Sequence, residues 1–219
     1  MATSTVEDYV KCILLEEQVQ TTELVSMGQI AVALSVAPGT VTSMVKTLAD
    51  SGLASYEPYS GVRLTSAGRQ LALHVLRRHR LVELFLVQVM GIDWSEVHAE
   101  AELLEHSVSD LLINRMDEML GNPQVDPHGD PIPTSQGKVN QPKVTSLLRC
   151  PIGVELCVVR VADQHPDFLQ LVEREGLKPG SRLEVESRSE AADTVLLIRA
   201  ERVQFSLGFR AASKIMVNS

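Results

Sequence analysis

Two histidines and two glutamates in the segment 98–106 carry donor atoms suited to a divalent metal. The segment reads HAEAELLEH and contains neither glycine nor proline, so we expect a helix that continues through SVSDLLINRMDEML. At 3.6 residues per turn, Glu102, Glu105 and His106 lie on one face, and His98 lies one turn before Glu102. Imidazoles and carboxylates on one helical face indicate a metal site. The segment taken alone favours the alternative, a solvated acidic face with two incidental histidines.

Three residues elsewhere add donor atoms at helical spacing. Asp8 lies in the first turn of a predicted amphipathic helix over 5–18. His79 and Glu83 are spaced i and i+4 in a second predicted helix over 69–91, which is a good spacing for two ligands of one metal. Each also has an ordinary explanation, because an acid in the first turn favours the helix dipole and i,i+4 pairs stabilise helices slightly.

The net charge argues against nucleic-acid binding at first sight. The 219 residues include 20 basic and 28 acidic side chains, for a formal net charge of −8. The excess is concentrated in residues 1–73, with net −3, and residues 74–145, with net −5, whereas residues 146–219 are balanced. A DNA-binding protein usually presents a basic surface. If part of the acidic excess consists of metal ligands, bound cations would offset it.

The cysteines and the apolar pattern indicate a cellular location. Cys12, Cys150 and Cys157 form no CxxC motif, which argues against a disulfide framework and fits a reducing compartment. No apolar run approaches the length of a membrane span, and the first residues lack the features of a secretory signal. We therefore expect a cytoplasmic protein with no membrane segment.

The N-terminal third has the pattern of a winged helix-turn-helix. A short helix at about 27–34 and a second at about 39–50 are separated by a tight turn, and apolar residues recur where two helices would pack. LASYEP and GVRLT then predict a two-stranded hairpin, the wing, in which Arg63 could contact phosphate. The residues expected to face outward from the second helix, toward the major groove, are Pro38, Gly39, Thr40, Thr42, Ser43 and Lys46. The alternative is a helix-turn-helix that serves only as a packing unit.

The C-terminal third changes character. Residues 121–142 carry five prolines and three glycines and predict a linker or an irregular surface strap. Beyond it, short alternating segments predict strands, among them SLLRC, VELCVVRVA, SRLEVESRS, TVLLIRA and ASKIMV, with one helix at PDFLQLVEREG. The expected fold class is α+β. The expected domains are a winged-helix domain over 1–73, a helical domain over 74–142, to which the resemblance given below assigns metal binding and dimerisation, and a small SH3-like β-barrel over 143–219.

Six motifs in family order resemble the DtxR/MntR family of metal-dependent transcriptional repressors. The resemblance covers most of residues 7–133 and is weaker in the C-terminal domain, where it rests on ADQHPDFLQL and GLKPGSRLEV. It implies a winged helix, a helical dimerisation domain and, as in longer members, an SH3-like domain of the FeoA kind. The motifs are EDYV (7–10), VAPGTVTSMVKTLADSGL (36–53), LTSAGRQLA (64–72), RRHRLVELFL (77–86), VHAEAELLEH (97–106) and HGDPIP (128–133).

The resemblance assigns two metal sites and about two ions per chain. The primary ligands that it implies are Asp8, Glu102, Glu105 and His106. The ancillary ligands that it implies are His79, Glu83 and His98. Further ligands come from the C-terminal domain in long members, and the candidates here are Asp163, Gln164 and Asp167.

The residue types at two primary positions bear on the metal. Iron-responsive members carry Met and Cys where this chain has Asp8 and Glu102, whereas manganese-responsive members carry the two carboxylates. Hard oxygen donors suit Mn²⁺, so Mn²⁺ is the expected metal and Fe²⁺ the alternative. The short manganese type has Glu where this chain has Lys11, which argues against a close binuclear cluster built with that residue.

The expected function is a metal-dependent repressor that binds operator double-stranded DNA as a homodimer and controls genes of metal-ion homeostasis. A metal that joins Asp8 to the 102–106 ligands would fix one domain against the other and order the dimer for operator binding. The protein is expected not to be an enzyme. The alternatives are an iron-responsive repressor of the same family, a metal-independent winged-helix regulator and a metallohydrolase, for which no HExxH or nucleophile motif is present.

Overall fold

A computed structural model describes residues 3–20, 22–199 and 203–218. The chain separates into two compact units. The N-terminal unit consists of the described residues of 1–79 together with 105–108 and 133–138. The C-terminal unit consists of 80–104, 109–132 and the described residues from 139 onward.

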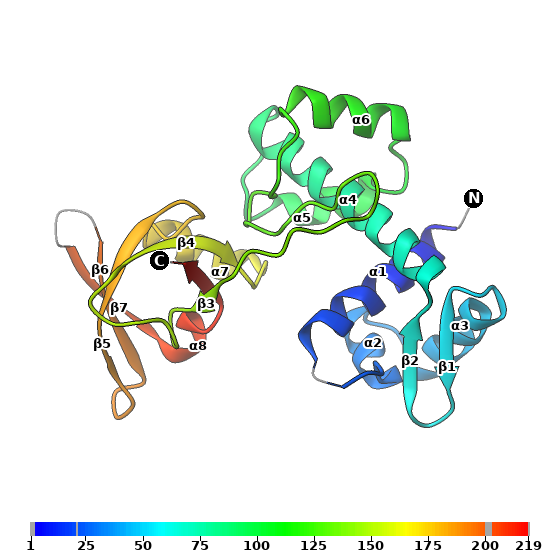
Figure 1. Ribbon diagram of the computed structural model, residues 1–219, viewed down its shortest axis with the longest axis horizontal. Helices are drawn as coiled ribbons and strands as arrows, with labels where there is room; N and C mark the ends of the chain where they lie inside the picture. Colours follow the sequence, from blue (N-terminus) through cyan, green and yellow to red (C-terminus); the bar gives the residue numbers. More distant parts are fainter. Residues whose placement is uncertain (1–2, 21, 200–202, 219) are drawn as a thin grey trace. The chain divides into compact units, whose positions relative to one another are not determined.

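The N-terminal unit contains the predicted helix-turn-helix and wing (Figure 1). Its helices and strands are α1 Ser4–Val19, α2 Met27–Ala33, α3 Pro38–Asp50, β1 Ala54–Glu57 and β2 Gly61–Leu64. The two strands pair antiparallel from Ala54 opposite Leu64 to Glu57 opposite Gly61. Val10 and Ile13 of α1, with Ile30 and Val45 of the helix pair, are fully buried in one apolar core. The winged-helix prediction is therefore confirmed.

Local sequence signals define where these helices begin. The Ser26 hydroxyl accepts the N–H of Gln29, whose side chain in turn accepts the N–H of Ser26, which makes a capping box for α2. Pro38 stands at the first position of α3, where its missing N–H costs nothing. The turn between the two helices passes through Ser35, whose φ of 54° ends α2 sharply.

The long helix α4, Ser66–Gln88, follows the wing. Its first turn is capped by the Thr65 hydroxyl, which accepts the N–H of Gly68 at 3.1 Å. Gly68 is required by close approach, because a Cβ there would lie 1.9 Å from the carbonyl oxygen of Leu53. Gly68, in the first turn of α4, therefore lets the helix pack tightly against Leu53, which follows α3.

The prediction of one continuous helix over 98–120 is wrong. The structure has α5, Val97–Leu104, and a separate α6, Asp110–Met119. The Ser109 hydroxyl accepts the N–H of Leu112, so a new N-cap begins α6 and the chain turns between the two helices. Glu105 and His106 therefore lie in the turn after α5 and not on its face.

The prediction that 121–142 is an unpacked linker is also wrong in its middle part. Asp126 and His128 are almost fully buried, and Pro131–Pro133 are buried as well. Arginines of α4 donate hydrogen bonds to backbone carbonyls of this segment. Arg77 donates to the carbonyl of Pro133 at 2.8 Å in the N-terminal unit, and Arg80 donates to the carbonyl of Pro131 in the C-terminal unit. The densest basic cluster of the sequence thus stabilises a proline-rich segment.

The C-terminal domain is an antiparallel six-stranded sheet with two short helices (Figure 1), in agreement with the predicted SH3-like domain. The strand order is β3-β8-β4-β5-β6-β7. The elements are β3 Thr145–Ser146, β4 Glu155–Val161, α7 Pro166–Arg174, β5 Arg182–Ser189, β6 Thr194–Arg199, β7 Val203–Gly208, α8 Phe209–Ala212 and β8 Ile215–Asn218. SLLRC is mostly a turn, β7 was not predicted, and Ala200 of the predicted strand TVLLIRA lies outside the described residues.

Within the described chain, no single helix is long and apolar enough to cross a membrane. The pair α2 and α3 reaches that length and hydropathy only together, with a bend of 109°. The apolar residues of this pair, such as Ile30, Val41 and Leu48, are buried in the core of the winged helix.

Glu17 of α1 connects the winged helix to α4, and its loss should destabilise the domain. Its carboxylate accepts the N–H of Leu64 at 2.8 Å and pairs with Arg69. Glu17→Ala removes the partner of a part-buried N–H and should lower the free energy of unfolding by about 1–3 kcal/mol. Glu17→Gln keeps an accepting oxygen and loses only an ion pair with a half-exposed arginine, so it should recover most of the stability.

Urea unfolding followed by circular dichroism measures both variants. Glu23→Ala is the matched control, because the Glu23 side chain is 91% exposed and its ion pair with Arg63 is long, at 3.9 Å. If Glu17→Ala changed the stability no more than Glu23→Ala, the structural role of Glu17 would be wrong.

Candidate metal centre

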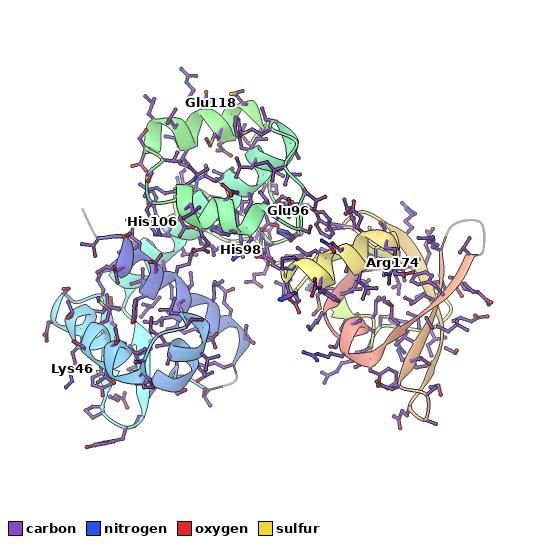
Figure 2. All side chains as sticks on the ribbon, turned by 180° about the vertical axis from the view of Figure 1, so that it is seen from behind. Lys46, Glu96, His98, His106, Glu118 and Arg174 are labelled. Carbon is purple, nitrogen blue, oxygen red and sulfur yellow. The ribbon has the colours of Figure 1, made fainter. Side chains whose placement is uncertain are left out.

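Asp8, Glu105 and His106 come together in the N-terminal unit. Nε2 of His106 lies 2.8 Å from Oδ1 of Asp8 and 3.2 Å from Oε1 of Glu105. Each of the three residues offers one ligand atom, and these atoms all lie within 4.8 Å of one another. α1 supplies Asp8, whereas the turn after α5 supplies Glu105 and His106, the latter labelled in Figure 2. The cluster therefore joins residues almost one hundred positions apart.

Glu105 is completely buried and is held by two side chains, the ammonium of Lys11 and the imidazole of His79. Nζ of Lys11 lies 2.6 Å from its Oε1, and Nδ1 of His79 lies 2.7 Å from its Oε2. Burial opposes ionisation, but the hydrogen bond from His79 and the charge of Lys11 outweigh it, so the pKa of Glu105 is lowered. Glu105 is therefore a carboxylate rather than a carboxylic acid.

His106 lies between carboxylates on both of its nitrogens. Nδ1 donates to Glu7 at 2.7 Å, and Nε2 faces Asp8. Burial would lower the pKa of His106, but the hydrogen bond to Glu7 and the charges of Glu105 and Asp8 raise it overall. Glu7 fixes the ring so that Nε2 points at the two candidate ligand oxygens. The predicted site did not include Glu7, although its place next to Asp8 is the sequence signal.

The donor set of this cluster fits a divalent metal. Two carboxylates and one imidazole are typical ligands of Mn²⁺ and Fe²⁺, and a metal on Nε2 takes the place of a proton. Glu102, the fourth predicted ligand, lies on the last turn of α5, where its Oε1 is 3.7 Å from Nε2 of His98. Its side chain is 39% exposed.

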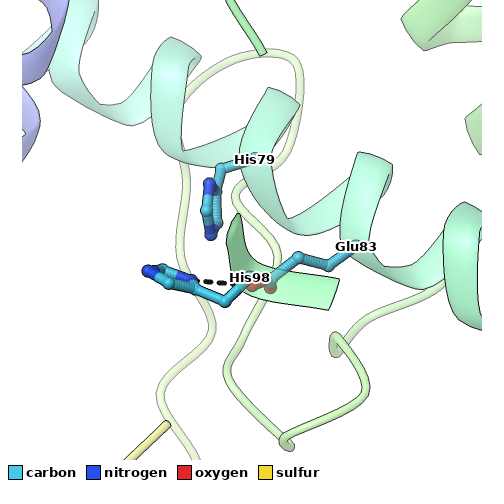
Figure 3. A group of neighbouring side chains, drawn as sticks. All are labelled: His79, Glu83 and His98. Atoms are coloured by element: carbon cyan, nitrogen blue, oxygen red, sulfur yellow. Dashed lines mark hydrogen bonds and ion pairs between the residues drawn. The ribbon is translucent and has the colours of Figure 1, made fainter. Parts of the chain in front are cut away.

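The predicted ancillary residues lie on two elements. His79 and Glu83 stand one turn apart on α4, and Nδ1 of His98 in α5 donates to Oε1 of Glu83 at 3.1 Å (Figure 3). Glu83 is fully buried and His98 is 43% exposed. Nδ1 of His79 is bonded to Oε2 of Glu105, so this predicted ancillary ligand also contacts a predicted primary one.

A second buried donor set includes two residues that were not predicted. Glu83, Asp126 and His128 each offer a ligand atom, all within 4.8 Å of one another, and all three side chains are buried. Nε2 of His128 donates to the carbonyl of Trp94 at 2.9 Å, and its Nδ1 lies 3.9 Å from Oε2 of Glu83. HGDPIP was the sequence signal, but its prolines favoured a linker.

Electrostatics and packing hold this second set in place. Burial and the neighbouring charges of Asp130 and Glu83 raise the pKa of Asp126, although Arg80 opposes them. Nδ1 of His128 and Oδ2 of Asp126 have no hydrogen-bond partner within the described ranges. Trp94 stacks on the His128 ring with centroids 5.5 Å apart and donates from Nε1 to Glu173. Buried acceptors that face one another are stabilised by a bound cation or a shared proton.

The three candidates in the C-terminal domain have different surroundings. Asp163 pairs with Lys214 and accepts the N–H of His165. Gln164 donates to Oδ2 of Asp130 at 3.4 Å, next to the second donor set. Asp167 is 90% exposed in the first turn of α7.

The predicted DNA-contacting residues lie on one helix and on the wing. Pro38, Gly39, Thr40, Ser43 and Lys46 of α3 are exposed, and Lys46 is labelled in Figure 2. Thr42 is half-buried, and its hydroxyl donates to the carbonyl of Pro38 at 3.0 Å. Arg63 of the wing is half-exposed and lies 3.9 Å from Glu23.

A winged helix followed by helices that carry clusters of metal-ligand residues defines a metal-responsive DNA-binding protein. The similarity of this chain to known proteins identifies the family. Residues 1–62 match "Iron dependent repressor, N-terminal DNA binding domain", residues 65–134 match "Iron dependent repressor, metal binding and dimerisation domain", and residues 145–219 match "FeoA domain". The iron-dependent repressor IdeR of Mycobacterium leprae is 32% identical over 206 residues, which cover 89% of this chain and 88% of that protein.

Solved structures agree over nearly the whole chain. A manganese-dependent transcriptional repressor in complex with manganese is 40% identical, with a TM-score of 0.90 and coverage of 98% of this chain and 99% of that chain. ScaR with bound Zn²⁺ is 30% identical, with a TM-score of 0.80 and coverage of 98% and 99%.

The chain belongs to the DtxR/MntR family of metal-dependent transcriptional repressors. It is a DNA-binding repressor with a metal-binding and dimerisation domain, as the resemblance implied. The members of this family are regulators rather than enzymes, which sets aside the metallohydrolase alternative.

Glu7 should control metal affinity without being a ligand. Glu7→Ala removes the carboxylate that orients His106, and such losses cost about 10–100-fold in metal affinity. Glu7→Gln keeps an oxygen that accepts from Nδ1 and should fall between Ala and wild type. Isothermal titration with MnCl₂ measures these affinities, and Glu16→Ala on the same helix is the control. Equal affinities for Glu7→Ala and Glu16→Ala would rule out an orienting role.

Proposed function

We propose that this repressor responds to Mn²⁺, with Fe²⁺ as the alternative, and binds operator double-stranded DNA as a homodimer to control genes of metal-ion homeostasis. One observation carries the proposal: Asp8 of the DNA-binding domain meets Glu105 and His106 of the segment that follows α5. A metal held by these residues ties the first helix of the winged helix to the metal-binding domain. Binding of metal and binding of DNA are thereby linked.

We propose about two ions per chain. The primary ligands are Asp8, Glu102, Glu105 and His106. The ancillary ligands are His79, Glu83 and His98, and the buried group formed by Glu83, Asp126 and His128 supports adding the last two to this site. From the C-terminal domain we propose Gln164, because it contacts Asp130 next to this group. Two divalent ions would change the formal net charge from −8 to −4 and ease approach to phosphate.

The preference for Mn²⁺ rests on donor chemistry. Asp8 and Glu102 supply carboxylate oxygens, and the ionised Glu105 adds another. Simple affinity would still follow the Irving–Williams order, in which Mn²⁺ is weakest. Selectivity must therefore lie in activation, because a set rich in oxygen donors suits a larger and harder ion. The manganese complex of the similar repressor adds support.

The homodimer is supported by exposed apolar side chains. They lie at the end of α4 and along α5, α6 and the segment after α6, and a protein that stayed monomeric would expose them to water. These residues are Val89, Met90, Leu103, Leu104, Leu111, Leu112, Met119 and Val125. We propose working domain boundaries of 1–73, 74–142 and 143–219, close to the ranges that the family domains match.

Direct contact with DNA is proposed for α3 and the wing. Two recognition helices of a dimer would enter successive major-groove half-sites, with α3 reading base edges. The proposed contacts are Pro38, Gly39, Thr40, Thr42, Ser43, Lys46 and Arg63. The exposure of most of these residues supports the proposal, as does the lack of a side-chain cap at the N-terminus of α3.

Removal of His106 should abolish metal-activated DNA binding. His106→Ala deletes one primary ligand whose side chain is partly exposed, at 17%. The variant should therefore remain a folded dimer, but metal should no longer increase its affinity for operator DNA. Fluorescence anisotropy with labelled operator DNA, titrated anaerobically with Mn²⁺ and with Fe²⁺, measures the response. Wild type should bind operator in the presence of Mn²⁺ and should release the operator when a chelator is added.

Three outcomes would contradict parts of this proposal. Operator binding by wild type in chelator would favour the metal-independent regulator. Activation by Fe²⁺ at a lower free concentration than Mn²⁺ would make the protein an iron-responsive member of the family. A wild-type response in His106→Ala would remove His106 from the ligand set.

Residues of α3 should divide into those that read sequence and those that bind the backbone. Ser43→Ala should reduce discrimination among operator variants by about 1–3 kcal/mol if its hydroxyl meets a base edge. Lys46→Ala should weaken binding to all sequences and reduce the salt dependence. Competition assays with operator and random DNA at several salt concentrations measure both effects. Equal losses on both DNAs for Ser43→Ala would place base recognition elsewhere.

A further inference from the structure

Lys11 is a buried lysine whose ammonium lies on a candidate metal ligand. It stands three residues after Asp8 on α1, is 7% exposed, and its Nζ lies 2.6 Å from Oε1 of Glu105. The same oxygen lies 3.2 Å from Nε2 of His106. Burial of a lysine is costly unless a partner neutralises it, so this contact requires a physical reason.

We propose that Lys11 is a built-in competitor of the divalent cation, which sets the metal concentration at which the repressor responds. Its ammonium neutralises Glu105 in the metal-free protein and thereby lowers the affinity of the cluster for metal. This inference rests on the proposed function of Asp8, Glu105 and His106 as the primary metal site.

Charge explains why the lysine competes. A divalent ion gains affinity from the negative charge of Asp8 and Glu105, and a fixed positive charge beside one of those oxygens cancels part of that attraction. The pair is almost free of solvent, with 8% of the Lys11 side chain and none of the Glu105 side chain exposed, so water screens it little. Lys11 therefore repels any cation that reaches Glu105.

The same contact links metal binding to stability. In wild type, Glu105 has a cationic partner before metal arrives, so the metal-free fold is stable. Without the ammonium, the buried carboxylate keeps the hydrogen bond from His79 but loses its nearest ion partner. The fold then gains more from a metal that binds only the native state. A variant that lacks the charge should be less stable without metal and should bind metal more tightly.

A purely positioning role predicts the opposite sign. If Lys11 served only to hold Glu105 in a geometry that metal needs, its removal would loosen Glu105 and weaken metal binding. The direction of the affinity change therefore separates the competitor from the positioning residue.

The experiment compares full-length wild type with Lys11→Met, Lys11→Arg and Arg182→Met. Lys11→Met keeps an unbranched side chain but no charge, and Lys11→Arg keeps the charge. Arg182 forms an ion pair with Glu155 at 2.9 Å between exposed side chains, and neither residue belongs to a donor set, so Arg182→Met is the control for loss of an ion pair elsewhere. Mn²⁺ affinity is measured by isothermal titration, and the midpoint of thermal unfolding is measured in chelator and in excess MnCl₂.

Lys11→Met is expected to bind Mn²⁺ about tenfold or more tightly than wild type. Its midpoint of thermal unfolding is also expected to be lower than that of wild type in chelator. Excess MnCl₂ should raise that midpoint more than it raises the midpoint of wild type. Lys11→Arg and Arg182→Met should resemble wild type in affinity. If Lys11→Met does not fold without metal, it is purified with Mn²⁺, and its affinity is measured by competition with EGTA.

Two results overturn the inference. Equal or weaker Mn²⁺ binding by Lys11→Met, with wild type binding normally, would show that Lys11 does not compete, while the proposed function survives. Absence of Mn²⁺ and Fe²⁺ binding by wild type would overturn the proposed metal site itself and the role of Lys11 with it.

Discussion

The burial of the Glu105 carboxylate is the constraint on which the metal centre depends. A charge with no solvent exposure must have partners, and Lys11 and His79 supply them from α1 and α4. These contacts hold the turn after α5 against the helix that carries Asp8. The candidate ligands are therefore held close together by contacts within the protein.

The helix α4 has a comparable structural role along the proline-rich segment. Arg77 and Arg80 donate to carbonyls of Pro133 and Pro131, and Arg80 lies 3.5 Å from Asp126. Prolines cannot donate hydrogen bonds, so their segment depends on side-chain donors to satisfy its carbonyls. This arrangement buries His128 and Asp126 beside Glu83. Two of the arginines in the densest basic cluster of the sequence are therefore used for internal packing.

Orienting contacts complete both donor sets. Glu7 accepts a hydrogen bond from Nδ1 of His106, and the Trp94 carbonyl accepts one from Nε2 of His128. In each ring this hydrogen bond orients the other nitrogen toward the neighbouring carboxylates. Trp94 is itself held through its indole N–H by Glu173 of the C-terminal domain. Several carboxylates of this acidic chain thus face imidazole or ammonium groups.

The sequence by itself determined the helix-turn-helix, the wing and most strands, since capping residues, turn residues and apolar periodicity are local signals. It also determined the family and the candidate ligands, because motifs such as VHAEAELLEH keep their residue types and order. Only the tertiary structure decided that the chain turns at Glu105, that Asp126 and His128 are buried, and that Lys11 pairs with Glu105. The physical reason is distance along the chain: Lys11 and Glu105 are 94 residues apart, and no local pattern records which buried charges will meet.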